Sequence, residues 1–281
     1  MSRERPEFGE FLRARRDRIT PAQAGITPFP GLRRVPGLRR DELAVLAGVS
    51  AEYYSRLEQG RQRNVSREVL DALARALRLT SVEHAHLIDL AHPVATRNVR
   101  IAEPPQRPEP GLLRVMSALD HLPVLLLGNR GEVLARNALL DAVLGRPIEP
   151  GTSFFSFLIQ DPLARERIIN WADFASTAIA AMRREAARRP FDRRLITLVD
   201  ELRAADPQVA RWWDDHTVRD YASVAKRIDH PQAGPLAFDI EIIGAADQLD
   251  QRLVVYTAEP DSRTARMLPL IASWETRTIA R

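Results

Sequence analysis

The sequence predicts a multidomain protein, with an all-α domain of five helices at the N-terminus and an α+β domain at the C-terminus. Three observations support this fold class. The chain has 281 residues, which is long for a single domain. Residues 92–110 hold five prolines and show no helical period. Hydrophobic residues recur at helical spacing before this stretch, and strand-like runs occur only after it.

The proline-rich stretch sets the expected domain boundaries. Proline fixes φ and prevents either regular structure from continuing, so such a stretch behaves as a semi-rigid linker. The charge balance of the chain also changes sign near residue 100. We therefore expect an N-terminal domain at 1–91, a linker at 92–111 and a C-terminal domain at 112–281.

Five helices are expected in the N-terminal domain. A proline- and glycine-rich loop at 20–37 separates the first helix from the others. Ser66 and Ser81 begin the last two helices, because a serine hydroxyl can cap the free backbone N–H groups there. Gly60 follows the third helix, where a left-handed C-cap favours glycine. The expected helices are 8–19, 39–47, 50–59, 66–77 and 81–91.

The C-terminal domain is expected to mix strands and helices. Two hydrophobic runs around the turn Gly128–Gly131 predict a β-hairpin. Helices are expected roughly between residues 137 and 217. The arginine-rich run Arg183–Arg189 predicts a solvent-exposed helix face, with a second DNA contact as the alternative. Strands that enclose a block of helices are typical of an α+β domain. The expected strands are 123–127, 132–135, 221–228, 236–243 and 251–257, followed by a helix at 262–274.

Positive charge is confined to the first third of the chain. Residues 1–100 hold 18 arginines and 12 acidic residues, a net charge of +6, whereas the remainder carries −2. This distribution favours a polyanionic partner for the N-terminal domain. Arginine suits such a partner because its guanidinium group binds an oxyanion through two parallel hydrogen bonds.

The composition excludes several classes of function. Without cysteine the chain has no disulfide, no thiolate metal site and no thiol catalysis. The charged N-terminus lacks the apolar core of a signal peptide, and no stretch approaches the ~18 apolar residues of a membrane helix. No nucleophile elbow, phosphate loop or metal-binding helix motif occurs. The sequence therefore predicts a cytoplasmic protein with no membrane partner, no cofactor and no metal site.

Residues 39–60 have the pattern of two helices joined by a tight bend. In the run Ala47–Ser50, glycine permits the bend, valine fills the core and serine caps the second helix. The expected buried contacts between the helices come from Leu43, Ala44, Val49, Tyr54 and Leu57. The outer face of the second helix, where a DNA-recognition helix carries its base-contacting side chains, then holds Ala51, Glu52, Ser55 and Arg56.

The charged residues of this segment suggest particular contacts to DNA. Arg56 can bind a guanine or a phosphate, and Glu52, one turn away, can accept from cytosine or orient Arg56. Arg40 begins the preceding helix and is expected on a phosphate. The alternative is an ordinary helical bundle with a solvated basic face. The complete predicted DNA-binding set is Arg39, Arg40, Ser50, Ala51, Glu52, Tyr53, Arg56, Arg61, Arg63 and Asn64.

The segment LRRDELAVLAGVSAEYYSRLEQGR resembles the XRE-type helix-turn-helix regulators, and more narrowly the MmyB-like regulators of actinomycetes. The C-terminal segments EVLARN, WWDDHTVRD and QRLVVYTAEPDS support the narrower resemblance, which covers nearly the whole chain. The resemblance implies a five-helix domain that binds double-stranded operator DNA, joined to a PAS-like ligand-binding domain. A known family member binds a fatty acid in that second domain, which suggests a small amphipathic ligand here.

Candidate ligand-binding residues lie among the aromatic segments of the C-terminal domain. An aromatic stripe at helical spacing forms core packing more often than a pocket, so both interpretations stay open. Arg211 suits a carboxylate, and His216 either donates to the same group or ends a helix. The predicted ligand-binding set is Asn137, Trp171, Phe174, Arg211, Trp213 and His216.

Two classes of function remain. The first is a transcription regulator that acts as a homodimer and whose operator affinity depends on the ligand. The second is an enzyme that acts on a small apolar molecule and carries a DNA-binding domain. An enzyme needs a poised acid–base pair, and only His216 beside Asp214 and Asp215 offers a candidate. The sequence therefore favours the regulator and predicts no catalytic residue.

Overall fold

The computed structural model describes residues 6–27, 35–62, 64–93, 106–219, 225–245 and 248–279. The five helices expected in the N-terminal domain are present within one or two residues of the expected bounds. A further short helix was not predicted, and the Thr20–Gln23 capping box and the left-handed Gly25 delimit it. The helices are α1 (Pro6–Arg18), α2 (Pro21–Ala24), α3 (Arg40–Ala47), α4 (Ala51–Glu58), α5 (Arg67–Ala76) and α6 (Ser81–Ala91).

The N-terminal helices enclose one hydrophobic core. Helix α1 crosses α4 so closely that a Cβ on Gly9 would lie 2.0 Å from the carbonyl oxygen of Glu58. Glycine at this position therefore lets the two backbones touch. Two buried residues of the C-terminal domain, Ala187 and Val218, also join this core. The core includes Phe8, Phe11, Leu12, Leu43, Tyr54, Leu57, Leu70 and Leu73.

The C-terminal domain is built on a five-stranded antiparallel sheet with the order β2-β1-β5-β4-β3. The expected hairpin is present, and Leu125 pairs with Arg136 across it. The expected strand at 221–228 begins later, at Lys226, and residues 221–224 lie outside the described residues. The strands are β1 (Val124–Leu127), β2 (Val133–Arg136), β3 (Lys226–His230), β4 (Gly234–Ala245) and β5 (Gln248–Thr257).

Helices cover both faces of this sheet. The side chains of β1 and β5 alternate, so Leu125 and Tyr256 face the main core while Val124 and Val255 face α7. Helix α7 (Pro110–Ala118) was not predicted. The other helices are α8 (Ala138–Leu144), α9 (Phe154–Gln160), α10 (Pro162–Arg167), α11 (Trp171–Arg188), α12 (Arg193–Ala205), α13 (Pro207–Asp214) and α14 (Arg263–Ile279). The observed architecture is α+β, as expected.

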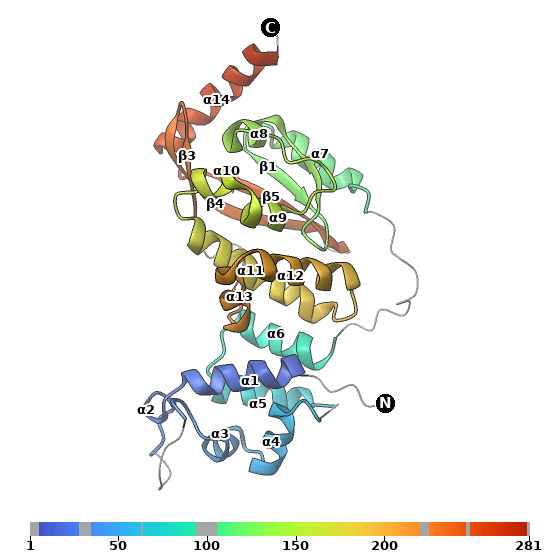
Figure 1. Ribbon diagram of the computed structural model, residues 1–281, viewed down its shortest axis with the longest axis vertical. Helices are drawn as coiled ribbons and strands as arrows, with labels where there is room; N and C mark the ends of the chain where they lie inside the picture. The colour runs from blue at the N-terminus through green and yellow to red at the C-terminus, as the bar shows by residue number, and fades with distance from the viewer. Residues whose placement is uncertain are drawn as a thin grey trace.

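Helices α11 and α12 lie between the sheet and the N-terminal domain, and α6 faces α11 (Figure 1). Helices α3 and α4 lie at the end of the molecule opposite α14 (Figure 1). The surface expected for DNA is therefore remote from the sheet, whereas α6 and α1 adjoin the C-terminal domain.

Three sequence-based expectations need correction. Thr80 rather than Ser81 caps α6, because the Thr80 hydroxyl accepts from the backbone N–H of Glu83. The run Arg183–Arg189 is not a solvent-exposed face, because Arg183 and Ala187 are buried and the other residues of the run are half-buried. The run forms the contact with the N-terminal domain instead. The expected linker also extends too far, because α7 begins at Pro110 and its N-cap Glu109 donates its N–H to Gln251. Residues 94–105 of the linker lie outside the described residues.

Candidate functional site

The bend between α3 and α4 has the expected local structure. Gly48 adopts a φ of +67°, and its N–H bonds back to the carbonyls of Ala44 and Val45. The Ser50 side chain accepts from the backbone N–H of Tyr53 at 3.1 Å and so caps α4. These contacts confirm the bend and the cap, and they orient α4 relative to α3.

A buried carboxylate fixes the position of α4 in the domain. Glu58 accepts hydrogen bonds from Arg16 Nε at 2.6 Å, from Arg40 Nε at 2.6 Å and from the Tyr54 hydroxyl at 2.9 Å. Burial alone would raise the pKa of Glu58, but the hydrogen bonds from Arg16 and Arg40 hold it below its usual value. The charged carboxylate therefore ties α1, α3 and α4 together.

The outer face of α4 presents the side chains expected there. Ala51, Glu52 and Arg56 are exposed, while Tyr53 and Ser55 are half-buried. Arg56 Nη1 lies 3.2 Å from Glu52 Oε1. This pair, which has one cation and one acceptor a turn apart, can hydrogen-bond to base edges or to phosphates.

The remaining predicted DNA-binding residues flank this face. The Arg40 side chain is 50% exposed although Glu58 holds its Nε, so part of its guanidinium group faces solvent. Arg61 and Asn64 are exposed, Arg39 is half-buried at the N-cap of α3, and Arg63 lies outside the described residues. The structure thus places the described members on or beside α3 and α4, and their contacts with DNA stay predictions.

The predicted ligand-binding residues do not come together in one place. Asn137 caps α8, and its carboxamide oxygen accepts from the N–H groups of Val124 at 3.0 Å and Leu140 at 3.1 Å. Its Nδ2 donates to the Leu122 carbonyl at 2.6 Å. These hydrogen bonds connect α8 to β1, so the structure gives Asn137 a structural role.

Trp171 and Phe174 lie on the first two turns of α11. The indole N–H of Trp171 donates to the Leu158 carbonyl at 2.7 Å, and its ring packs against Trp212, with 5.8 Å between centroids. Phe174 is buried in the main core. Of the six predicted residues, only Phe174 is in the buried part of this core.

Arg211, Trp213 and His216 belong to α13 and its end. Arg211 is exposed, and the Arg183 guanidinium carbon lies 4.4 Å from the Trp213 ring centroid. His216 Nδ1 is 3.2 Å from Arg183 Nη1, and the His216 carbonyl accepts from Arg15 at 2.8 Å. Burial and the charge of Arg183 lower the pKa of His216 to about 4. His216 therefore lies at the contact between the domains, where its Nε2 is 3.9 Å from Glu10 Oε2 of α1.

The predicted ligand-binding set omits Lys226, which the structure places in the main core. Lys226 is fully buried, and its Nζ donates to the Tyr256 hydroxyl at 3.1 Å. Burial lowers its pKa to about 7. A signal was available in the sequence, because Lys226 is the only lysine among 41 basic residues.

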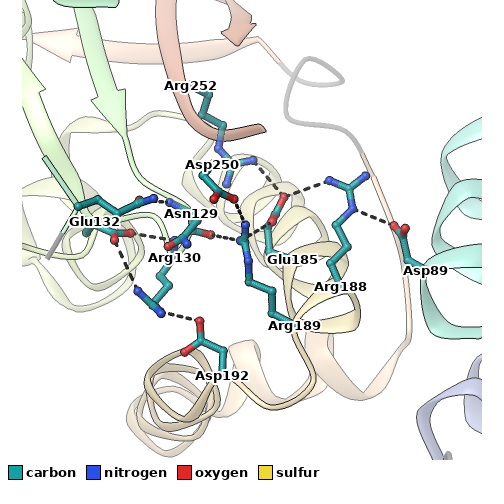
Figure 2. A network of polar contacts seen from close by, with 11 residues as sticks. Asp89, Asn129, Arg130, Glu132, Glu185, Arg188, Arg189, Asp192, Asp250 and Arg252 are labelled. Carbon is teal, nitrogen blue, oxygen red and sulfur yellow. Dashed lines mark hydrogen bonds and ion pairs between the residues drawn. The ribbon is translucent and has the colours of Figure 1, made fainter. Parts of the chain in front are cut away.

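Sequence reasoning also missed a network of ion pairs between the domains, which Figure 2 shows. Arg188 Nε on α11 donates to Asp89 on α6 at 3.0 Å. Glu185, one turn earlier on α11, accepts from Arg252 of β5 at 3.2 Å. Arg189 pairs with Glu185 and with Asp250. Through α11, the network connects the sheet with helix α6 of the N-terminal domain.

Two family matches identify the class of protein as a DNA-binding transcription regulator with a ligand-binding domain. Residues 7–87 match the model of a helix-turn-helix domain family, and residues 108–270 match the family described as MmyB-like transcription regulator ligand binding domain. The chain belongs to the MmyB-like transcription regulators. None of the curated proteins matches its sequence. Among the described helices, none has the length and apolar character needed to cross a membrane.

Proposed function

We propose that the protein binds operator DNA as a homodimer and that an amphipathic, fatty-acid-like ligand in the C-terminal domain changes its operator affinity. The observation that carries this proposal is the direct contact of α11 with α6. Helix α11 belongs both to the core of the ligand-binding domain and to the interface with the DNA-binding domain. A ligand that alters the packing of α11 therefore also alters the contacts that hold α6 in position.

The DNA-binding part of the proposal rests on α4 and the charge around it. Arg56 reads a base or a phosphate, Glu52 orients Arg56 or accepts from cytosine, and Arg40 contacts a phosphate through its exposed part. The net charge of +6 in residues 1–100 supplies affinity for any sequence. The face of α4 then supplies the preference among sequences.

The ligand part of the proposal rests on the apolar core of the C-terminal domain. Aromatic and aliphatic side chains from α9 and α11 meet the sheet there, with few polar groups among them. Such a core suits a molecule with a long apolar tail and one polar head. The predicted contacts to the ligand's head group are Arg211, His216 and Asn137. Asn137 lies apart from the other two in the structure, which does not favour a shared role.

The coupling of the two parts requires a ligand that binds one arrangement of the domains better than another. The proline-rich linker is one path for this coupling. The ion pair between Arg188 and Asp89 provides a second path that does not use the linker. In the same region, Arg15 donates to the His216 carbonyl, and Arg18 pairs with Asp215 at 2.6 Å.

The test uses the full chain and an operator chosen by selection from random duplexes. Operator affinity is measured by fluorescence anisotropy with and without saturating dodecanoic acid. We expect the acid to change the affinity by roughly 5- to 150-fold. Failure to enrich any sequence would contradict operator recognition. Equal affinities in both conditions, with binding of the acid shown separately, would contradict the coupling.

A further inference from the structure

We propose that Lys226 is the anchor for the carboxylate head of a ligand bound in the core of the C-terminal domain, with Tyr256 as a second hydrogen-bond donor. This inference rests on the proposed ligand-binding function and adds to it the anchoring residue and the charge of the ligand. It assigns the head group to a position that differs from those of Arg211 and His216.

The first observation is the surroundings of the Lys226 amine. Lys226 is the first residue of β3, opposite Phe238 on β4. Its Nζ lies 5.5 Å from the ring centroid of Phe154, 4.8 Å from that of Phe174 and 5.0 Å from that of Tyr256. These rings come from α9, α11 and β5. The amine therefore sits inside an apolar cage between the sheet and the helices that cover it.

The second observation is that the cage provides no counter-ion. Among the described residues, no carboxylate lies within 4 Å of Nζ, and the one hydrogen bond to the amine is that with Tyr256 at 3.1 Å. An ammonium group has three N–H donors, so most of its hydrogen-bonding capacity is unused here. Buried charges in proteins are nearly always paired. The described part of the cage therefore lacks the counter-ion that a carboxylate ligand would supply.

The groups around the Lys226 amine determine its protonation state when no ligand is bound. The neighbours from α9, α11 and β4 are phenylalanines, and among the residues that the structure describes, the titratable group in contact with the amine is Tyr256 on β5. Burial raises the pKa of Tyr256, so its phenol keeps its proton. Burial lowers the pKa of Lys226 to about 7, so this amine can lose its proton near neutral pH.

The third observation is the choice of side chain. Arginine supplies every other basic residue of this chain, and Lys226 is the only lysine. A guanidinium group cannot be deprotonated in a protein, whereas an amine can. Lysine is thus the basic side chain that can stay neutral in an apolar core and become charged when an acid arrives.

Binding of an acid then involves a single proton transfer and needs no other reactant. A neutral carboxylic acid transfers its proton to the neutral amine, which leaves a carboxylate beside an ammonium group. The Tyr256 hydroxyl, released from accepting the amine hydrogen bond, donates to the same carboxylate. The aromatic rings of the cage face the methylene groups next to the head. Monocarboxylic acids with an apolar tail fit this arrangement, whereas the corresponding alcohols provide no counter-ion.

The single lysine allows a direct experiment on the full chain. Protein grown with lysine labelled with carbon-13 at Cε gives one side-chain signal, whose chemical shift reports the charge of the amine. We expect a neutral amine at pH 8.5 and a charged one after saturation with dodecanoic acid. Dodecanol, which has the same tail, should leave the amine neutral. An unchanged signal on saturation with the acid would overturn the proposal without any variant.

Binding measurements by isothermal titration complete the test. We expect Lys226→Met to lower the affinity for dodecanoic acid by about tenfold or more and to leave the affinity for dodecanol unchanged. Arg194→Ala, at an exposed position of α12, serves as the control and should bind the acid as the unmodified protein does. Because the free amine must take up a proton above pH 7, the affinity for the acid should fall by up to about tenfold per pH unit there. The methionine variant should lack this slope.

The outcomes separate the two proposals. Equal affinity of the unmodified protein and the methionine variant for the acid would overturn the role of Lys226 and leave the proposed ligand class intact. Equal binding of acid and alcohol by the unmodified protein would overturn the requirement for a carboxylate. If neither compound binds the unmodified protein, both the anchor and the proposed ligand class are wrong.

Discussion

Glu58 and Lys226 are both buried ionisable side chains, and their surroundings give opposite results. The Glu58 carboxylate has three donors, two of them guanidinium groups, so its charge is stabilised in the fold. The Lys226 amine has one phenol and otherwise aromatic rings, so burial favours its neutral form. Glu58 therefore has the surroundings of a charged group with a structural role. Lys226 has the surroundings of an amine whose counter-ion is not among the described residues.

The Glu58 network gives the first prediction. Glu58→Gln should destabilise the N-terminal domain by about 3 kcal/mol, because it removes the buried carboxylate that pairs with both Arg16 and Arg40. Chemical unfolding at pH 7 measures the change. The matched control is Glu52→Gln on the same helix, where the side chain is 82% exposed and no change is expected. Equal stabilities of the two variants would show that the buried network does not hold the domain together.

His86 gives the second prediction, which concerns pH. Its side chain is buried, its ring packs edge-on against Phe11, and its Nδ1 has no hydrogen-bond partner among the described residues. Burial, with the nearby charges of Arg183 and Arg184, lowers its pKa from 6.5 to about 3. Between these two values the unfolded chain binds a proton that the folded chain does not, so stability falls as the pH is lowered through this window.

The expected loss from His86 is about 2 kcal/mol between pH 7 and pH 5. His86→Leu should remove this part of the loss in chemical unfolding at the two pH values. His216, whose pKa is lowered to about 4, contributes with the same sign and remains in the variant. His121→Leu at an exposed position is the control and should keep the full difference. Parallel pH curves for the unmodified protein and His86→Leu would contradict the assignment.

Arg56 gives the third prediction. If it reads a base, Arg56→Ala should weaken operator binding by ~1–3 kcal/mol and bring the operator closer in affinity to random DNA. The control is Arg67→Ala, which removes another exposed arginine from an ion pair of the same spacing, that with Asp71 at 3.2 Å. Competition titrations give the ratio of operator to random affinity for each variant. A proportional loss on both DNAs for Arg56→Ala would assign it to a phosphate.

At the scale of elements, α11 has two functions along its 18 residues. Its first turns place Phe174 in the core of the ligand-binding domain, next to Lys226. Its last turns place Ala187 in the core of the N-terminal domain and Arg188 against Asp89 (Figure 2). A helix of this length spans about 27 Å at 1.5 Å per residue. A shift at one end therefore reaches the other within one rigid element.

The contact between α11 and α6 gives the fourth prediction. Arg188→Ala should reduce the effect of dodecanoic acid on operator affinity by ~0.5–2 kcal/mol, with acid binding to the isolated protein unchanged. Exchange of the pair, Asp89→Arg with Arg188→Asp, should restore part of the effect. Arg203→Ala, whose ion pair with Asp214 lies within the C-terminal domain, is the control. If dodecanoic acid changes the operator affinity of Arg188→Ala as much as that of the unmodified protein, the coupling does not pass through this ion pair.

Elements with a strong local signal could be predicted from the sequence. The bend at Gly48 and the caps at Ser50 and Ser66 depend on contacts within a few residues, so the helices of the N-terminal domain were predicted closely. The β-hairpin was predicted for the same reason. Helices α2 and α7 were missed because prolines near their starts suggested loops, although proline is well tolerated in the first turn of a helix.

Residues whose role depends on distant elements could not be predicted in the same way. The run Arg183–Arg189 has the composition of a solvated face, and only the approach of α6 turns it into an interface. The sequence predicted that Asn137 binds a ligand. In the structure, both its carboxamide oxygen and its Nδ2 hydrogen-bond to the backbone around β1 and α8. For Lys226, the count of lysines was visible, while the burial that gives it meaning required the assembled sheet.

For the whole molecule, charge and shape are arranged along one axis. The domain with net positive charge occupies one end, its helices α3 and α4 face away from the sheet, and the ligand-binding core lies beyond α11 (Figure 1). A DNA duplex bound at α4 would therefore not touch the core around Lys226. Any effect of a ligand on DNA affinity must pass through the contacts of α1 and α6 with α11 and α13, through the linker, or through a second copy of the chain.

The fifth prediction concerns that second copy. Helix α4 has eight residues and spans about 12 Å, which is about a third of the ~34 Å turn of B-DNA. One copy therefore contacts only a few base pairs, too few for a high ratio of specific to random affinity. Two copies related by a two-fold axis would place two such helices in successive major grooves. We expect the selected operator to be palindromic, with half-site centres about 10 base pairs apart or a multiple of that distance. Sedimentation of the complex should give two proteins per operator, and one protein per operator at saturating concentration would contradict the dimer.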